Sequence, residues 1–274
     1  MLIKKLFFVV LLTSGLAYSQ TNLPRISQVD RIFFISEIDG LTANIVNPAG
    51  LSIKPDDDGF LFSYDFVDFS NQGNSFASLS MGNFGFSYQD IFNYNNLRLQ
   101  NYSINLSIGG EFLAIATSNK IVSVGYPTYS RDFFSVDAGI ILRPANSVSL
   151  AFVARNLSEP EIDSLDFRRN YTAGIGLFLF NDAIKLFGEI DFGKNDTINK
   201  NVAGSVGIVL QPVDFLEVRA GAYRNPERIY EGFLAFNFLI ENSFRFLIST
   251  RFNEQQERTR YSAMIVLPLQ TVKF

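Results

Sequence analysis

The sequence of 274 residues contains no cysteine and no histidine. Without cysteine there are no disulfides, no thiolate nucleophile and no sulfur ligand for a metal ion. Without histidine the chain lacks the commonest general base, and with it a Ser-His-Asp triad. The Gly-x-Ser-x-Gly motif of the hydrolases is also missing. These absences predict a protein that is not an enzyme and that carries no metal site and no cofactor.

The chain also lacks an excess of basic residues. It has 23 Lys and Arg against 27 Asp and Glu, a net charge of −4. This charge offers no basic surface for nucleic acid, which is therefore not expected as a partner. Hydrophobic residues nevertheless make up 47% of the sequence, with 29 Phe and 11 Tyr. So much apolar surface must fill a large core or face lipid.

The first nineteen residues have the three-part layout of a secretory signal peptide. Lys4 and Lys5 precede an apolar run from Leu6 to Leu12, and Ala17 and Ser19 occupy the −3 and −1 positions of a cleavage site. The run is too short for a membrane-spanning helix, which needs about 20 apolar residues. We therefore expect residues 1–19 to be a signal peptide and the mature chain to begin at Gln20.

Beyond the signal peptide the dominant pattern is the alternation of a β-strand. In Asn101–Ile108, Tyr102, Ile104 and Leu106 alternate with small polar residues. Successive side chains of a strand point to opposite faces, so one face of this strand is apolar and the other polar. Fourteen such strands are expected, at residues 58–68, 74–81, 83–92, 96–108, 111–118, 132–143, 147–156, 169–180, 183–193, 201–211, 214–224, 228–239, 243–252 and 258–269.

The connections between these strands alternate in length. Those after even-numbered strands are tight, as at Ala145-Asn146, whereas several of the others are long and polar, as at 119–131, 157–168 and 194–200. Outer-membrane barrels have short periplasmic turns and longer external loops. The sequence therefore predicts an all-β fold, a transmembrane antiparallel barrel over residues 58–274. Its even strand number places both termini on the periplasmic side.

Charged residues recur on the less apolar face of the strands. In a barrel this face is the lumen, and the residues expected to line it are Glu189, Asp191, Glu217, Arg219, Glu231, Arg245 and Arg251. These charges either line a solute path or pair with one another and fill a closed barrel. The apolar face should point outward into lipid, with Phe62, Leu106, Leu186 and Ile265 as examples. A soluble β-sandwich also alternates and is the competing fold.

Three short segments carry a resemblance to a known superfamily. The segment Gly40–Leu51 reads GLTANIVNPAGL, Ser135–Pro160 reads SVDAGIILRPANSVSLAFVARNLSEP, and Leu216–Pro226 reads LEVRAGAYRNP. In this order they resemble the FadL-type and PorV/PorQ-like outer-membrane β-barrels. The resemblance implies about fourteen strands and an N-terminal hatch inside the lumen, here residues 20–57. Asn47, Pro48, Ala49 and Gly50 form its motif.

Three functions are compatible with these features. The first is a FadL-like outer-membrane channel for hydrophobic or small solutes. The second is a PorV/PorQ-like barrel that binds subunits of a type IX secretion system in Bacteroidota-type bacteria. The third is a secreted, soluble β-sandwich that binds a ligand. The chain is short for a FadL transporter and has no long external loop for capturing a ligand.

Two acidic clusters have a metal-binding interpretation and a simpler one. Asp56-Asp57-Asp58 offers carboxylates for calcium, but it lacks the spacing of an EF-hand loop. A solvated turn into the first strand is therefore the expectation there. Glu159, Glu161, Asp163 and Asp166 lie together in one external loop, where their charge is expected to keep the loop soluble.

Overall fold

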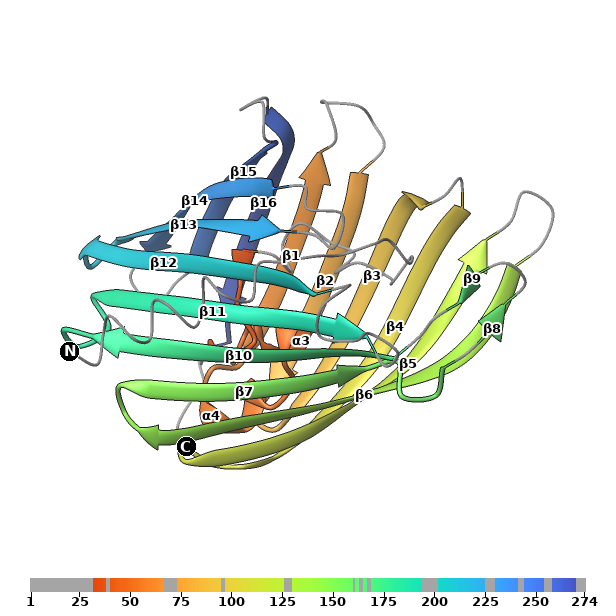
Figure 1. The fold of residues 1–274 in the computed structure, drawn as a ribbon, viewed down its shortest axis with the longest axis horizontal. Helices are drawn as coiled ribbons and strands as arrows, with labels where there is room; N and C mark the ends of the chain where they lie inside the picture. The colour runs from red at the N-terminus through yellow and green to blue at the C-terminus, as the bar shows by residue number, and fades with distance from the viewer. Residues whose placement is uncertain are drawn as a thin grey trace.

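The computed structural model describes residues 32–37, 40–66, 73–94, 97–125, 130–159, 161–162, 165–166, 169–193, 202–224, 230–240, 244–253 and 258–269. Fourteen antiparallel strands form a closed barrel (Figure 1). They are β1 (Gly59–Phe66), β2 (Gly73–Met81), β3 (Phe84–Tyr94), β4 (Leu97–Gly109), β5 (Leu113–Gly125), β6 (Ser130–Ala145), β7 (Val148–Arg155), β10 (Asn170–Leu179), β11 (Ile184–Gly193), β12 (Ala203–Val213), β13 (Leu216–Arg224), β14 (Tyr230–Ile240), β15 (Phe244–Phe252) and β16 (Arg258–Pro268).

Pairing of the first strand with the last closes the barrel. β1 pairs with β2 on one side and with β16 on the other, in a register that runs from Gly59↔Pro268 to Phe66↔Tyr261. Every other strand pairs with its neighbours in the chain, β7 with β10 included. The closed ring rules out the two open sheets of a β-sandwich. The fourteen-stranded barrel predicted from the alternation is confirmed.

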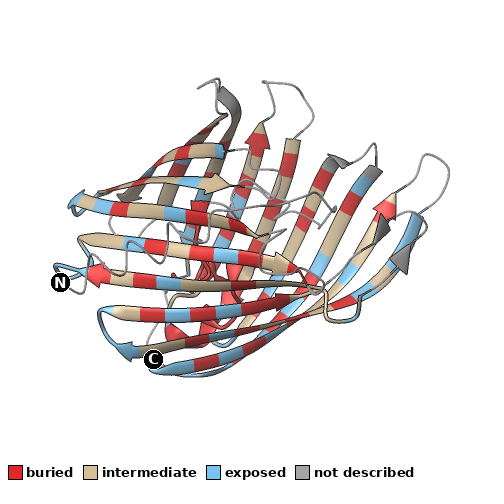
Figure 2. Ribbon diagram, viewed as in Figure 1, coloured by how far each residue is buried: buried red, intermediate tan, exposed pale blue. Residues whose placement is uncertain are grey.

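The strands keep one face outward and one face inward. Buried residues alternate with intermediate or exposed ones along most of the described ribbons in Figure 2. Phe62, Leu106, Leu186 and Ile265 lie on the outer face with exposed fractions of 52%, 46%, 36% and 41%, as predicted. The inner face instead carries small polar residues, such as Ser103 and Ser118, and buried charges.

One predicted loop is wrong. Residues 119–125 continue β5 and residues 130–131 begin β6, and the two strands pair through this region, for example Asn119↔Val136 and Lys120↔Ser135. Polar residues such as Asn119 and Lys120 resemble a loop in the sequence, but a lumen accepts them within a strand. The connection is therefore only residues 126–129. In the acidic loop, β8 (Glu161–Ile162) and β9 (Leu165–Asp166) form a small separate hairpin.

Two single-turn helices, α3 (Ala43–Val46) and α4 (Gly50–Ile53), precede the barrel. They lie within the ring of strands in Figure 1, and α3 contacts β3 while α4 contacts β4 and β5. No helix among the described residues is both long and apolar enough to cross a membrane. The described residues from α3 to α4 therefore lie inside the lumen.

Candidate functional site

Residues 32–37 and 40–57, which the structure describes ahead of β1, form what we call the inner segment. Most of its apolar side chains are almost fully buried, with Ile32 and Ile35 at 0% exposed and Phe33 and Phe34 at 1%. These residues belong to the same apolar cluster as lumen-facing residues of the wall, among them Phe187. The hydrophobic effect therefore favours the segment inside the barrel, because moving it out would expose this surface to water.

Phe34 lies in an aromatic niche of the wall. Its ring stacks on Phe187 with centroids 4.9 Å apart and is tilted against Phe233 at 6.4 Å. Gly207 forms the back of the niche, since a Cβ atom added there would lie 2.6 Å from Cε2 of Phe34. Glycine is thus required at this position for the ring to approach the backbone of β12. A Cβ atom added at Gly174 would likewise lie 2.9 Å from Cγ1 of Ile35.

Asn47 of the Asn-Pro-Ala-Gly motif holds the turn between α3 and α4. Its Oδ1 accepts a hydrogen bond from the Ala49 amide at 3.2 Å, while its Nδ2 donates to the carbonyls of Ile35 and Ile140 at 3.1 and 3.3 Å. Gly139 of the wall leaves room for this side chain. The motif therefore joins two parts of the inner segment to each other and to β6.

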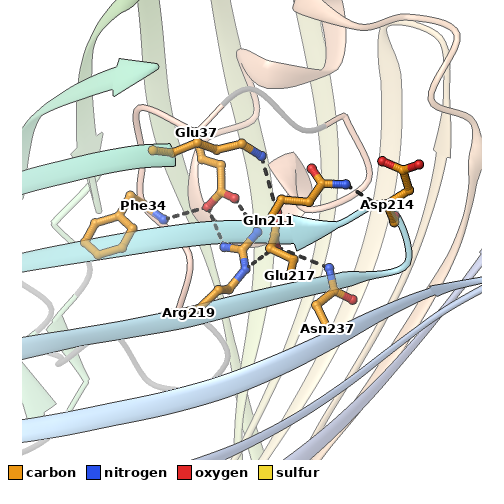
Figure 3. A network of polar contacts seen from close by, with 8 residues as sticks. Phe34, Glu37, Gln211, Asp214, Glu217, Arg219 and Asn237 are labelled. Atoms are coloured by element: carbon orange, nitrogen blue, oxygen red, sulfur yellow. Dashed lines mark hydrogen bonds and ion pairs between the residues drawn. The ribbon is translucent and has the colours of Figure 1, made fainter. Parts of the chain in front are cut away.

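A buried ion cluster connects the inner segment to β13 (Figure 3). The guanidinium of Arg219 donates to both carboxylate oxygens of Glu37, at 2.6 and 3.0 Å, and its Nε donates to Glu217 at 2.7 Å. Lys185 lies 3.3 Å from the other oxygen of Glu217, and the ring of Phe33 lies 4.5 Å from Cζ of Arg219. Two cations therefore neutralise two carboxylates, and the side chains of Glu37, Glu217 and Arg219 are nearly buried. We call Glu37, Lys185, Glu217 and Arg219 the Arg219 cluster.

The other charged residues predicted to face the lumen also do so, in separate places. Glu189 accepts hydrogen bonds from the Ile35 amide and, at 3.2 Å, from Ser205. Asp191 accepts one from Thr172 at 2.5 Å, and Arg251 pairs with Glu231 at 3.1 Å. Arg245 borders a cavity near the end of the barrel. Most of these charges are therefore paired or bonded to the inner segment.

Several polar residues of the lumen were not singled out from the sequence. Glu37 lies outside the alternating region, so no pattern marked it. Lys120, which pairs with Asp137, was assigned to a loop. Arg155 donates to Thr172 at 2.6 Å and to the Val46 carbonyl at 3.2 Å. Lys120, Asp137 and Arg155 lie at inward-facing positions of β5, β6 and β7. The alternation of these strands is the signal that could have identified them.

The inner segment lies between two cavities. On the side of the long connections is a cavity of about 110 Å³, the loop-side cavity, which Asn44, Ile45, Val46 and Pro48 border from the inner segment. At the end with the tight turns is a cavity of about 650 Å³, the turn-side cavity, bordered by Glu37, Leu41 and residues 54 and 56–58. A solute that moves along the lumen would have to pass the inner segment, which lies between the two cavities.

The described residues of the two acidic clusters, 56–58 and 159–166, make hydrogen bonds and ion pairs within the protein. Asp58 accepts a hydrogen bond from the Gly82 amide at 2.5 Å and so fixes the turn between β2 and β3. Glu159 pairs with Arg169 at 3.2 Å, and Asp163 lies outside the described residues. Within the described part of the chain, no three acidic side chains come close enough together to hold a metal ion.

No family model and no curated protein matches the sequence. Solved structures match the fold. The CymD monoaromatic hydrocarbon channel superposes with a TM-score of 0.62 at 13% identity, over 92% of this chain and 99% of the other. The toluene transporter TbuX of Ralstonia pickettii gives 0.65 at 9% identity, over 89% and 97%. A FadL homologue of Pseudomonas aeruginosa gives 0.58 at 12%, over 93% and 100%.

Proposed function

We propose that this chain, whose barrel has the FadL-type fold, is an outer-membrane channel for small or hydrophobic solutes and not an enzyme. Residues 1–19 direct its export, both termini lie in the periplasm, and the outer face of the strands contacts lipid. Residues 20–57 are the hatch of this channel. No described feature favours the alternative of a partner-binding barrel in a secretion system.

One observation carries the proposal: the inner segment separates two cavities of the same lumen. It is bordered by the loop-side cavity on one side and the turn-side cavity on the other. Its contacts with the wall include the Phe34 niche, Asn47 and the Arg219 cluster. A fourteen-stranded barrel encloses more space than its own side chains fill. The segment therefore acts as a plug that must shift before a solute crosses.

Deletion of residues 22–50 tests the plug. We expect the deletion variant to conduct ions in planar bilayers well above the level of the intact protein, because the inner segment no longer separates the two cavities. If the intact protein already conducts like an open porin and the deletion changes nothing, the proposal fails and a general diffusion pore is the better description.

A single substitution tests the same point with the whole chain in place. Gly207→Val puts a side chain where Phe34 now lies, so it should displace the inner segment and raise conductance. Gly188→Val is the matched control on the neighbouring strand, since the atom nearest to an added Cβ there is Cγ2 of Ile175 at 3.8 Å. Equal conductance in the two variants would contradict the proposal that the contact of Phe34 with the wall at Gly207 holds the plug in place.

A further inference from the structure

The inner segment presents a turn of four residues, 34–37, to the wall. The carbonyl of Phe34 accepts a hydrogen bond from the Glu37 amide at 2.9 Å, and the Glu37 carboxylate accepts one from the Phe34 amide at 3.3 Å. An aromatic ring and a carboxylate are thereby held close together on one turn of the chain, as Figure 3 shows. This turn therefore has the size and the chemical groups of a short peptide ligand.

Both the ring and the backbone of the turn are recognised. The ring of Phe34 lies in its niche, stacked on Phe187 with centroids 4.9 Å apart. The Ile35 amide donates to the Glu189 carboxylate of β11, and the Ile35 carbonyl accepts from Asn47 at 3.1 Å. Hydrogen bonds to a backbone N–H and a backbone C=O fit a peptide and not a hydrocarbon, which has neither group.

The carboxylate of the turn meets a guanidinium of the wall. Both oxygens of Glu37 accept from Arg219, at 2.6 and 3.0 Å. A two-pronged contact of this kind selects a carboxylate by geometry as well as by charge. The wall members of the Arg219 cluster are two cations and one carboxylate. They therefore keep one net positive charge when Glu37 leaves.

These wall groups lie close together on three neighbouring strands. Phe187 of β11 pairs with Gly207 of β12, which in turn pairs with Gly221 of β13. Glu189 lies two positions from Phe187 on β11. Arg219 lies two positions from Gly221 on β13, so both charged residues share the inward face with the niche. One short ligand can therefore contact the niche and both charged groups, as the turn does.

The ionic end of this site is next to the turn-side cavity. Glu37, Lys185 and Glu217 border this cavity of about 650 Å³. A solute in the cavity therefore reaches the Arg219 cluster directly. Glu37 can be solvated in the same cavity once it leaves Arg219, because it already borders it.

We propose that this site binds a short peptide with an aromatic residue and a carboxylate three positions later, and that residues 34–37 occupy it as an internal substitute. The inference rests on the proposed channel function and names a class of its solutes. Peptide and turn compete for the same contacts, so a bound peptide keeps the turn off the wall. The linked turn has an effective concentration on the order of millimolar, which a free peptide must exceed.

A blocked tetrapeptide with the sequence of the turn, N-acetyl-Phe-Ile-Ser-Glu-amide, tests the site. It is titrated against the full chain in lipid nanodiscs by saturation-transfer NMR, with empty nanodiscs as the blank. Glu37→Gln weakens the internal competitor and leaves Arg219 in place. We therefore expect this variant to bind the peptide about tenfold more tightly than the intact chain does. Glu231→Gln, the same change at the separate ion pair with Arg251, is the matched control and should leave the affinity unchanged.

Changes in the peptide separate recognition from partitioning into the membrane. On the Glu37→Gln variant, a peptide with glutamine in place of glutamate should bind about tenfold more weakly, because it lacks the carboxylate that pairs with Arg219. A peptide with the same residues in the order Ile-Glu-Phe-Ser should bind no better than that. Equal binding of the three peptides, or no gain in affinity from Glu37→Gln, overturns the inference.

The two proposals fail in different experiments. If deletion of residues 22–50 raises conductance but the peptide does not bind, the plug stands and the solute class is wrong. If the peptide binds as expected but the deletion leaves conductance unchanged, the peptide site stands and the plug is wrong.

Discussion

At the scale of single residues, the face of a strand decides what a substitution costs. Leu106 is on the outer face of β4, and Ser118 is buried on the inner face of β5, where it borders the loop-side cavity. A charge near the bilayer midplane on the outer face costs about 2–4 kcal/mol. Inside the lumen the same charge meets polar neighbours.

We therefore expect Leu106→Arg to reduce the amount of folded barrel far more than Ser118→Arg does. The measurement is the fraction with heat-modifiable gel mobility in an outer-membrane preparation. Asn105, the adjacent inward residue, is a poorer control because its Nδ2 donates to Asn44 of the inner segment at 2.7 Å. Equal yields of the two arginine variants would contradict the assignment of the faces.

Arg219 is the residue whose loss should cost most stability. Its removal leaves Glu37 and Glu217 buried with Lys185 as the one remaining cation of the Arg219 cluster, and breaking a buried pair in this way costs about 3–5 kcal/mol. Arg219→Met should lower the midpoint of urea unfolding, followed by tyrosine fluorescence. Arg251→Met should cost less, since its partner Glu231 is 27% exposed and can be solvated. A larger loss of stability from Arg251→Met than from Arg219→Met would contradict the conclusion that the Arg219 cluster contributes more to the stability of the barrel.

At the scale of elements, the connections predict the orientation of the barrel in the membrane. Because the strands are antiparallel, the connection at residues 126–129 and the turn at Asn146-Ser147 lie at opposite ends of β6. We expect an epitope tag at 126–129 to bind antibody on intact cells and a tag at Asn146-Ser147 to bind it only after permeabilisation. The reverse result would place the connection at residues 126–129 in the periplasm.

The inner segment shows how an element depends on its surroundings. α3 and α4 are four residues each and have no side-chain N-cap hydrogen bond. Helices this short are not stable alone in water. Packing against the wall and the contacts of Asn47 therefore stabilise them, which accounts for the lack of a helical pattern in this part of the sequence.

At the scale of the whole molecule, closure should make the barrel stable as a single unit. Deleting residues 258–274 removes β16 and leaves β1 and β15 with unpaired edges, each losing a ladder of eight residue pairs. Open edges do not persist in lipid, because their backbone groups have no water to bond. We expect this truncation to abolish heat-modifiable mobility. Shortening the connection between β11 and β12 keeps every ladder and should preserve that mobility.

Much of the barrel could be predicted from local patterns. The alternation in Asn101–Ile108 follows from the geometry of one strand, and the outward position of Leu106 follows from its phase. Charges such as Arg219 and Glu217 were assigned to the lumen on the same basis. The pattern became ambiguous at Asn119 and Lys120, because polar residues on both faces of a strand resemble a loop.

The sequence by itself determined the fourteen alternating strands, the face on which residues such as Leu106 lie, and the absence of cysteine and histidine chemistry. Only the tertiary structure decided which distant groups meet. Glu37 and Arg219 are 182 positions apart, and Phe34 and Gly207 are brought together from different ends of the chain. A period of two residues specifies the face on which a side chain lies. It does not specify which side chain lies opposite across the lumen. Barrel closure and the path of the inner segment determine which residues come close together there.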